Sequence, residues 1–314
     1  MTKSSPAAQL HPVGAGAYAW IGADGDSNAG AVDTGDSLLV IDTQQNESLA
    51  RSFRAALADQ LGKPVRAVVN THYHLDHVAG NAVFAGEVPI IAHERTAEAF
   101  ATLLGANGGR GWTVTDLPTK SALCYGENFS DLVANDAAAR AEADHRLSEP
   151  GYERITIVPP THTFSDRFAF HLADEVVRLG YFGPAHCDGD VVVHLERAKV
   201  LFLGDLFVHG RFPWIGDCDL DGWIRVLDTV LTFEIDTVIP GHGPPASLRE
   251  LGKFRDLLTA LRDAVATAIG SGASEDTAAR DVRLPRYETM PRYPEWIGAN
   301  VRSAYRHLRG RRRG

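Results

Sequence analysis

The sequence predicts a mixed α/β fold in which two β-sheets lie face to face and helices cover their outer faces. Three observations predict it. The chain has 314 residues, 44% of them hydrophobic, which is ample for a large buried core. Short β-branched runs alternate with longer segments of helical periodicity. The order of strands followed by helices occurs twice along the chain, a pattern that suits two sheets packed between helices.

The first group of elements begins as an antiparallel meander, because Gly, Asp and Asn turns separate its short apolar runs. One helix follows the meander and a second follows the last strand, and the first carries an apolar stripe at every fourth residue from Leu49 to Leu61. We expect strands at 17–23, 27–33, 37–42, 65–70 and 87–93, and helices at 46–61 and 94–104.

The second group repeats this order after a segment of different character. Residues 105–150 are first glycine-rich and then alanine-rich and charged, so we interpret them as an insertion or lid within a single domain spanning 1–314. A C-terminal tail, about 275–314, is expected to be mostly helical, with a proline-rich break at 285–294. We expect strands at 152–158, 167–173, 175–182, 190–195, 199–204 and 236–240, and helices at 219–232 and 246–269.

Charge and composition exclude several classes of function. The net charge is −9, which makes a nucleic-acid backbone a poor partner. No apolar stretch approaches the ~20 residues of a membrane helix, and the N-terminus lacks the apolar core of a signal peptide. The three cysteines, Cys124, Cys187 and Cys218, are too dispersed for a disulfide framework or a cysteine zinc site. We therefore expect a cytoplasmic protein, in an oligomeric state that the sequence does not determine.

The segment Thr71–His77 (THYHLDH) is the densest cluster of chemically active side chains. It directly follows the strand expected at 65–70. His72 and His74 are two residues apart, which places both imidazoles on one side of an extended backbone. Asp76 and His77 follow as the chain turns, so the segment offers the nitrogen and oxygen ligands that zinc accepts. A chance polar loop is the alternative, but the pattern HxHxDH is too dense for that reading to be preferred.

Three further candidates also follow strands. They are His186 in GPAHCDGD, Asp205 in LFLGD and His242 in IPGHG. Taken one at a time, each has an ordinary alternative: a solvated loop histidine, a turn aspartate or an incidental histidine between glycines. Cys187 is adjacent to His186, but we interpret it as a small packed residue and not as a ligand or nucleophile.

Taken together, these motifs resemble the metallo-β-lactamase-fold superfamily. The resemblance spans about residues 12–270 and holds five separate motifs in the order of the family, including Asp42 at the end of an early strand. It implies a four-layer αββα sandwich with the metals at one edge of the two sheets. It also implies that Asp42 supports the metal loop from behind, and that Asp188 or Asp190 helps to fix the imidazole tautomers.

When the ligands of the family are assigned to this chain by position, the resemblance implies a binuclear centre that holds two Zn²⁺ per chain. The same ligands also suit iron or manganese. Asp205 is implied to bridge the two ions, and Asp76 to orient the nucleophile and pass a proton. The implied ligands of the first ion are His72, His74 and His186, and those of the second are Asp76, His77 and His242.

The implied function is hydrolysis, in which a zinc-bound hydroxide attacks an ester, lactone, thioester or amide carbonyl of a small-molecule substrate. True β-lactamases carry cysteine or serine at the position of Asp205, so the aspartate favours the sulfur-oxidation and quinoprotein-associated, lactonase and glyoxalase II-like branches. Three alternatives stay open: β-lactamase-like amide hydrolysis, a non-haem iron oxidoreductase, and a non-catalytic binding protein, which retention of all seven ligand positions argues against.

Residues just after Asp205 are candidates for substrate contact. They are His209, Arg211 and Trp214. The planar guanidinium of Arg211 could hold a carboxylate or phosphate group. An equally weighted alternative is that Arg211 pairs with Asp217 or Asp219 of the protein.

Overall fold

A computed structural model defines the architecture of the chain. It describes residues 8–106, 112–113, 127–135, 137, 140–141, 144, 148, 150–152, 154–172, 174–216 and 218–310. The insertion expected at 105–150 therefore lies mostly outside the described residues.

The first large sheet has seven strands in the order β1-β2-β3-β4-β5-β6-β9. Strands β1 to β4 pair antiparallel, as the turn-separated meander predicts, whereas β4, β5, β6 and β9 pair parallel. The strands are β1 (Gln9–Gly14), β2 (Ala17–Ile21), β3 (Ala29–Asp33), β4 (Leu38–Ile41), β5 (Val65–Val69), β6 (Ile90–His93) and β9 (His162–Phe164).

The second large sheet has five strands in chain order, antiparallel except for the parallel last pair. A separate two-stranded ribbon joins β7 (Trp112–Thr113) to β8 (Arg154–Ile155). The strands of the second sheet are β10 (Arg167–His171), β11 (Val176–Gly180), β12 (Val192–Leu195), β13 (Val200–Phe202) and β14 (Thr237–Ile239).

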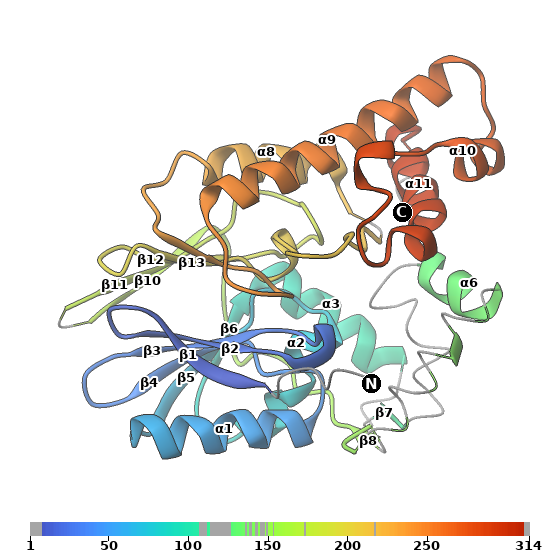
Figure 1. Cartoon of the computed structure of the whole chain (residues 1–314). Coiled ribbons are helices and arrows are strands. Elements are labelled where there is room, and N and C mark those ends of the chain that lie inside the picture. Colours follow the sequence, from blue (N-terminus) through green and yellow to red (C-terminus); the bar gives the residue numbers. More distant parts are fainter. Residues whose placement is uncertain are drawn as a thin grey trace, which may run out of the picture.

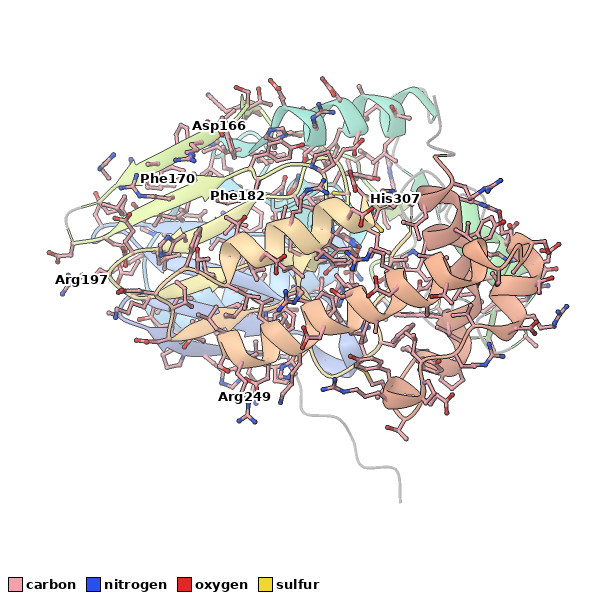
Figure 2. All side chains as sticks on the ribbon, turned by 90° about the horizontal axis from the view of Figure 1, so that it is seen from above. Asp166, Phe170, Phe182, Arg197, Arg249 and His307 are labelled. Carbon is pink, nitrogen blue, oxygen red and sulfur yellow. The ribbon has the colours of Figure 1, made fainter. Side chains whose placement is uncertain are left out.

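Helices cover the outer faces of both sheets, so the four-layer αββα prediction is confirmed (Figure 1). Helix α1 (Glu47–Leu61) packs on the first sheet through Ala50, Phe53 and Leu57. Helices α8 (Leu220–Val230) and α9 (Leu248–Gly270) lie over the second sheet (Figure 2). The other α-helices within the described residues are α2 (Leu75–Val78), α3 (Glu94–Ala106), α6 (Glu127–Asn135), α10 (Glu275–Asp281) and α11 (Tyr293–Leu308).

The apolar core between the sheets explains why they stay together. Ile41 and Val69 of the first sheet belong to the same buried cluster as Leu179, Val193 and Phe202 of the second. Each of these side chains is at most 3% exposed. Burial of a side chain of this size is worth about 1.5–3 kcal/mol, so this layer holds the two sheets in a fixed relation. That fixed relation sets the positions of the loops at the sheet edge.

Two sequence predictions differ from the structure in the strands. The strand expected at 152–158 is wrong: only Arg154–Ile155 is a strand, and it pairs with β7 outside both large sheets. Strands β1 and β9 were not expected. The β1 sequence contains a proline and a glycine, and β9 has three residues, so both depend on pairing with a neighbour and not on local propensity.

The C-terminal tail is described up to residue 310. Helices α10 and α11 flank a short 3₁₀ turn at Pro285–Tyr287, within the expected break. Among the described residues, no helix is long and apolar enough to cross a membrane.

The chain topology brings the candidate residues to one edge of the two sheets. Asp42 follows β4 and Thr71–His77 follow β5, which is parallel to β4. Asp205 follows β13 and His242 follows β14, which is parallel to β13. The carboxyl ends of parallel strands lie at the same edge of a sheet, and the facing sheets place the two edges together.

Candidate metal centre

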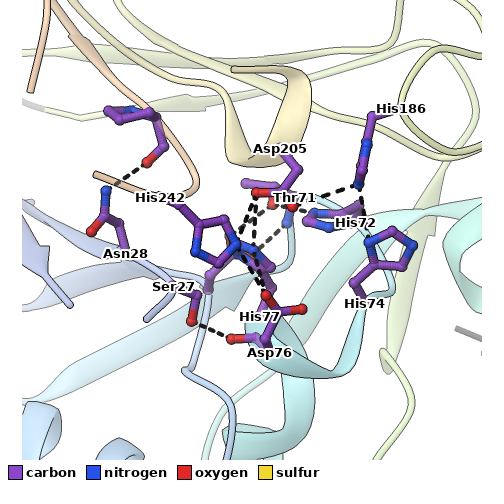
Figure 3. Close-up of polar contacts among 12 residues, drawn as sticks. Ser27, Asn28, Thr71, His72, His74, Asp76, His77, His186, Asp205 and His242 are labelled. Carbon is purple, nitrogen blue, oxygen red and sulfur yellow. Dashed lines mark hydrogen bonds and ion pairs between the residues drawn. The ribbon is translucent and has the colours of Figure 1, made fainter. Parts of the chain in front are cut away.

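The structure gathers all seven predicted ligand residues into two groups that share one carboxylate (Figure 3). Within each group, the nitrogen and oxygen atoms that could bind a metal lie within 4.8 Å of one another. The first group is His72, His74, His186 and Asp205, and the second is Asp76, His77, Asp205 and His242.

Three imidazoles and the shared Asp205 form the first group, and the ring nitrogens face one another. Nε2 of His186 lies 3.0 Å from Nδ1 of His74, and the two rings meet edge to face. The ring of His72 also meets the ring of His74 edge to face, at 4.7 Å between centroids. All three side chains are at least 95% buried. Three converging nitrogens at a strand end are the type of set that holds a zinc ion.

The second group mixes nitrogen and oxygen atoms. Nε2 of His242 lies 3.1 Å from Oδ2 of Asp76 and 3.4 Å from Oδ1 of Asp205. Nε2 of His77 lies 3.3 Å from the same Oδ1 of Asp205. On the other side, Oδ2 of Asp205 lies 3.6 Å from Nε2 of His186 in the first group. The two oxygens of Asp205 thus face different groups, which is the orientation of a bridging carboxylate.

Asp42 lies directly beneath this cluster, 3% exposed, as the resemblance implied. Its carboxylate accepts hydrogen bonds from the backbone N–H and the hydroxyl of Thr71, at 2.8 and 2.7 Å. It also lies 3.0 Å from Nδ1 of His77. Since a carboxylate only accepts, Nδ1 of His77 carries the hydrogen and Nε2 is left to face Asp205. Asp42 therefore sets both the loop conformation and one imidazole tautomer.

Burial governs the protonation of the first group. It holds the pKa of His72 well below its usual value and lowers the pKa of His74 to about 3 and that of His186 to about 4. Neighbouring histidines add to this effect on the pKa of His72 and His74. These three rings are therefore neutral at pH 7, with lone pairs available to a metal.

Charge pairing governs the second group. Burial opposes ionisation of Asp205, but His242 and His77 hold its pKa well below its usual value. Burial alone would lower the pKa of His77, but Asp76 and Asp205 outweigh it and raise that pKa well above its usual value. The two carboxylates are thus ionised and are balanced by protons on imidazoles, a charge that a divalent cation can replace.

Buried atoms without hydrogen-bond partners show that these residues fit a metal ion. Nε2 of His72, Nε2 of His77 and Oδ1 of Asp205 are buried, and among the described residues none of them has a partner in hydrogen-bond geometry. Such atoms normally cost free energy when they are left unsatisfied. A first-row divalent cation would satisfy all three, and the nitrogen and oxygen donor set suits zinc, iron or manganese alike.

Two glycines allow the loops of the second sheet to come this close. A Cβ atom on Gly241 would lie 2.0 Å from Oδ1 of Asp205, and one on Gly204 would lie 2.4 Å from Oγ1 of Thr71. Gly204 also has φ +49°, which disfavours larger residues. Gly241 lets two loops of the second sheet, after β13 and β14, pass within contact distance, and Gly204 lets the loop after β13 approach the loop after β5 of the first sheet.

Asp190 makes a different contact from the one expected. Its carboxylate accepts from the backbone N–H of Cys187 at 2.7 Å and from the Cys187 thiol at 3.2 Å, not from an imidazole. Burial raises the pKa of Asp190 to about 7. Cys187 is 6% exposed, and burial raises the pKa of its thiol, as expected of a packed cysteine. Asp190 thus holds the loop that carries His186.

The three candidate substrate contacts all touch protein groups. Arg211 donates from Nη1 to the carbonyl of Gly25 at 3.0 Å and lies over the ring of Trp296, 5.5 Å from its centroid. Trp214 meets Trp296 edge to face, at 5.9 Å. His209 lies 3.0 Å from the carbonyl of Pro244 through Nδ1.

Sequence reasoning missed the residues that join the two halves of the site. Gly25, Ser27 and Asn28, just before β3, contact the loops of Asp76 and His242. They act through backbone groups, a hydroxyl and an amide. Their only signal in the sequence is a turn motif of the kind that occurs throughout the first 45 residues.

Comparison with known proteins identifies the fold and several relatives. The sequence profile of the Metallo-beta-lactamase superfamily matches residues 22–242. The linear primary-alkylsulfatase of Pseudomonas sp. (strain ATCC 19151) is 26% identical over 298 residues, covering 89% of this chain and 55% of that protein. The chain thus spans about half the length of this relative.

Two further comparisons agree with this result. The 2,4-dinitroanisole O-demethylase subunit alpha of Nocardioides sp. (strain JS1661) is 25% identical over 294 residues, covering 90% of this chain and 74% of that protein. The solved structure of the inverting sec-alkylsulfatase Pisa1 from Pseudomonas sp. superposes with a TM-score of 0.70 at 19% identity. That superposition covers 95% of this chain and 50% of Pisa1, and it shows a shared fold.

Proposed function

The chain belongs to the metallo-beta-lactamase superfamily, and from this premise we propose that it is a metal-dependent hydrolase that cleaves an ester bond of a small molecule. One observation carries the proposal: two groups of metal-binding side chains share the carboxylate of Asp205. The names of the relatives favour a sulfate ester as the first substrate class to test. Carboxylic esters, lactones and thioesters are the next classes, because the sequence favours acyl substrates.

The proposed assignment follows the two groups, with Asp205 common to both and zinc as the proposed cation. A pair of divalent cations, when bound, would lower the pKa of water and stabilise negative charge on the oxygens of the substrate. Under this assignment His72, His74 and His186 hold the first cation, and Asp76, His77 and His242 hold the second.

Asp76 is the residue we propose for proton transfer. Its side chain is 21% exposed, whereas those of Asp205 and His242 are 11% and 6% exposed. It is therefore the most accessible carboxylate of the centre and the one that water and a substrate can reach. Its Oδ2 lies 3.1 Å from Nε2 of His242. From this position Asp76 would orient the attacking water and carry its proton to the departing oxygen.

A substrate panel with the zinc-loaded protein tests the proposal. The panel holds a primary and a secondary alkyl sulfate, a carboxylic ester, a lactone, a thioester, a chromogenic β-lactam, a phosphodiester and 2,4-dinitroanisole. We expect an alkyl sulfate or an acyl ester to have the highest kcat/KM, and His72→Ala to remove the activity. His194→Ala is the matched control, because His194 lies on β12 and stacks on Phe233, outside both ligand groups.

The same panel separates the alternatives. Preferred cleavage of 2,4-dinitroanisole would place the chain with its demethylase relative, and preferred cleavage of the β-lactam would contradict the argument from Asp205. If the zinc-loaded protein hydrolyses no ester, or if His72→Ala is as active as the wild type, the proposal fails.

A further inference from the structure

The segment Gly22–Asn28, which precedes β3, joins the two loops that carry the second group of ligands. Asn28, 3% exposed, donates its backbone N–H to the carbonyl of Gly241 at 2.7 Å. Its side-chain amide donates to the carbonyls of Pro240 and Gly243, at 2.9 and 2.8 Å. Asn28 thus binds the backbone on both sides of His242 and holds that turn against the first sheet.

Ser27 makes the matching contact on the other side of the segment. Its hydroxyl donates to the carbonyl of Asp76, and its own carbonyl accepts from the side chain of Gln44 at 2.8 Å. Figure 3 shows Ser27 directed toward Asp76 and Asn28 directed toward the turn of His242. Two adjacent residues therefore set the separation of the Asp76 and His242 loops.

Gly25 orients the His242 ring itself. Its carbonyl oxygen lies 3.0 Å from Nδ1 of His242 and accepts from Nη1 of Arg211, also at 3.0 Å. A carbonyl oxygen cannot donate, so Nδ1 of His242 carries the hydrogen. Nε2 is therefore the ring nitrogen that faces Asp76 and Asp205, where a metal would bind.

We propose that Arg211 is a positioning residue for the second metal-binding group, acting through the carbonyl of Gly25 on the ring of His242. This inference rests on the proposed assignment of His242 as a metal ligand. It replaces the expectation that Arg211 contacts the substrate.

The surroundings of Arg211 support a fixed position. Its guanidinium lies over Trp296 of helix α11. The neighbouring Phe212 donates its backbone N–H to the carbonyl of Pro291 at 2.8 Å. The buried side-chain amide of Asn300 donates to the carbonyl of Pro213 at 2.7 Å and accepts from the backbone N–H of Ile215 at 3.2 Å. Helix α11 and the turn before it thus hold the loop that carries Arg211 through these contacts.

Stepwise zinc binding to the metal-free full chain tests the proposal, using Arg211→Ala and Arg211→Lys with a competing chelator. We expect Arg211→Ala to weaken the second binding step by ~10–100-fold, the usual effect of losing a group that orients a ligand, and to leave the first step unchanged. Arg211→Lys should recover part of the loss, because an ammonium can donate one hydrogen bond to Gly25.

Arg292→Ala is the matched control. Its guanidinium lies over the same Trp296 ring, at 5.7 Å, without the hydrogen bond to Gly25. Both zinc affinities of this variant should equal those of the wild type. A second readout is the NMR spectrum of ¹⁵N-labelled histidine in the metal-free protein, recorded at a pH high enough for the His242 ring to be neutral. The wild type should show His242 as the Nδ1–H tautomer, and Arg211→Ala should show a mixture of tautomers.

Other results would overturn the inference. One is an equal loss of affinity at both zinc-binding steps in Arg211→Ala, and another is binding of a single zinc ion by the wild type. A third is an Arg211→Ala variant with unchanged zinc binding and a raised KM for an anionic ester, which would make Arg211 a substrate contact. If the selective loss occurs in a protein that hydrolyses no ester, the positioning role stands and the proposed reaction fails.

Discussion

The carboxylate of Asp205 lies between the two ligand groups, with Oδ2 3.6 Å from His186 and Oδ1 3.3 Å from His77. It is 8% exposed and ionised, so its negative charge is available to two cations at once. A neutral or monodentate residue at this position cannot serve both groups. Asp205 is therefore the residue whose substitution best tests the binuclear assignment.

We expect Asp205→Asn to bind the second zinc ion more weakly and to lose more than ~100-fold in kcat. The loss of a residue that supports a ligand usually costs ~10–100-fold, and the loss of a proposed ligand itself should cost more. Asp205→Cys should retain one zinc ion, because thiolate binds zinc at ~2.3 Å, but should lose most of its activity. Zinc stoichiometry and kcat/KM for both variants provide the measurement. Full activity of Asp205→Asn would rule out a bridging role.

Asp42 contacts Thr71 and His77 but is in neither of the two ligand groups. In Asp42→Ala, the backbone N–H of Thr71 and Nδ1 of His77 lose their buried acceptor. We expect metal affinity to fall by ~10–100-fold. Each buried group left unsatisfied should also reduce stability by about 1–3 kcal/mol. Zinc titration and denaturant unfolding provide the measurement, with exposed Asp59→Ala on helix α1 as the control. Unchanged affinity would remove Asp42 from the site.

At the scale of elements, the turn Gly241–Gly243 depends on its contact with the turn at Asp205. We expect Gly241→Ala to weaken zinc binding and to destabilise the fold by about 1–3 kcal/mol, because the added Cβ would lie 2.0 Å from Oδ1 of Asp205. Gly270→Ala is the matched control, since nothing lies within 4 Å of its added Cβ at the end of helix α9. Thermal unfolding and zinc titration should separate the two variants. If the two variants have the same Tm and the same zinc affinity, the close approach of the two turns is not required for folding or for zinc binding.

At the scale of the molecule, the centre joins the two sheets. The loops after β4 and β5 come from the first sheet, and those after β11, β13 and β14 come from the second. An ion held by both sets of loops would bind only the folded state, because unfolding separates the loops. A free zinc concentration of 100 times its dissociation constant would then raise the free energy of unfolding by about 2.7 kcal/mol.

We therefore expect removal of the metal with a chelator to lower Tm by several degrees, and zinc to restore it. The wild type should contain about two metal ions per chain. His72→Ala should show a smaller dependence of Tm on zinc, whereas His194→Ala should respond like the wild type. If Tm does not respond to chelator or zinc, the site does not bind metal in the folded protein.

The sequence by itself determined the layered αββα architecture, the long helices and the set of residues that meet at the centre. Helices α1, α8 and α9 each lie within a residue or two of their predicted bounds, because an apolar stripe is a local pattern that survives folding. The HxHxDH segment is also a local pattern. It directly follows the predicted strand at 65–70, and this position is enough to place it at the edge of the sheet. The roles of these residues in metal binding remain predictions.

Only the tertiary structure decided how the two halves of the centre are held in register. The hydrogen bonds from Asn28 to Pro240, from Arg211 to Gly25 and from His242 to Gly25 join residues 186 to 217 positions apart. Their acceptors are backbone carbonyls, which every residue possesses, so no residue type marks them in the sequence. The pairing of β1 with β2, the pairing of β9 with β6 and the orientation of the Asp205 carboxylate between the two groups are decided in the same way. They depend on which chain segments the apolar core between the sheets brings within hydrogen-bond distance, and that is a property of packing, not of local sequence.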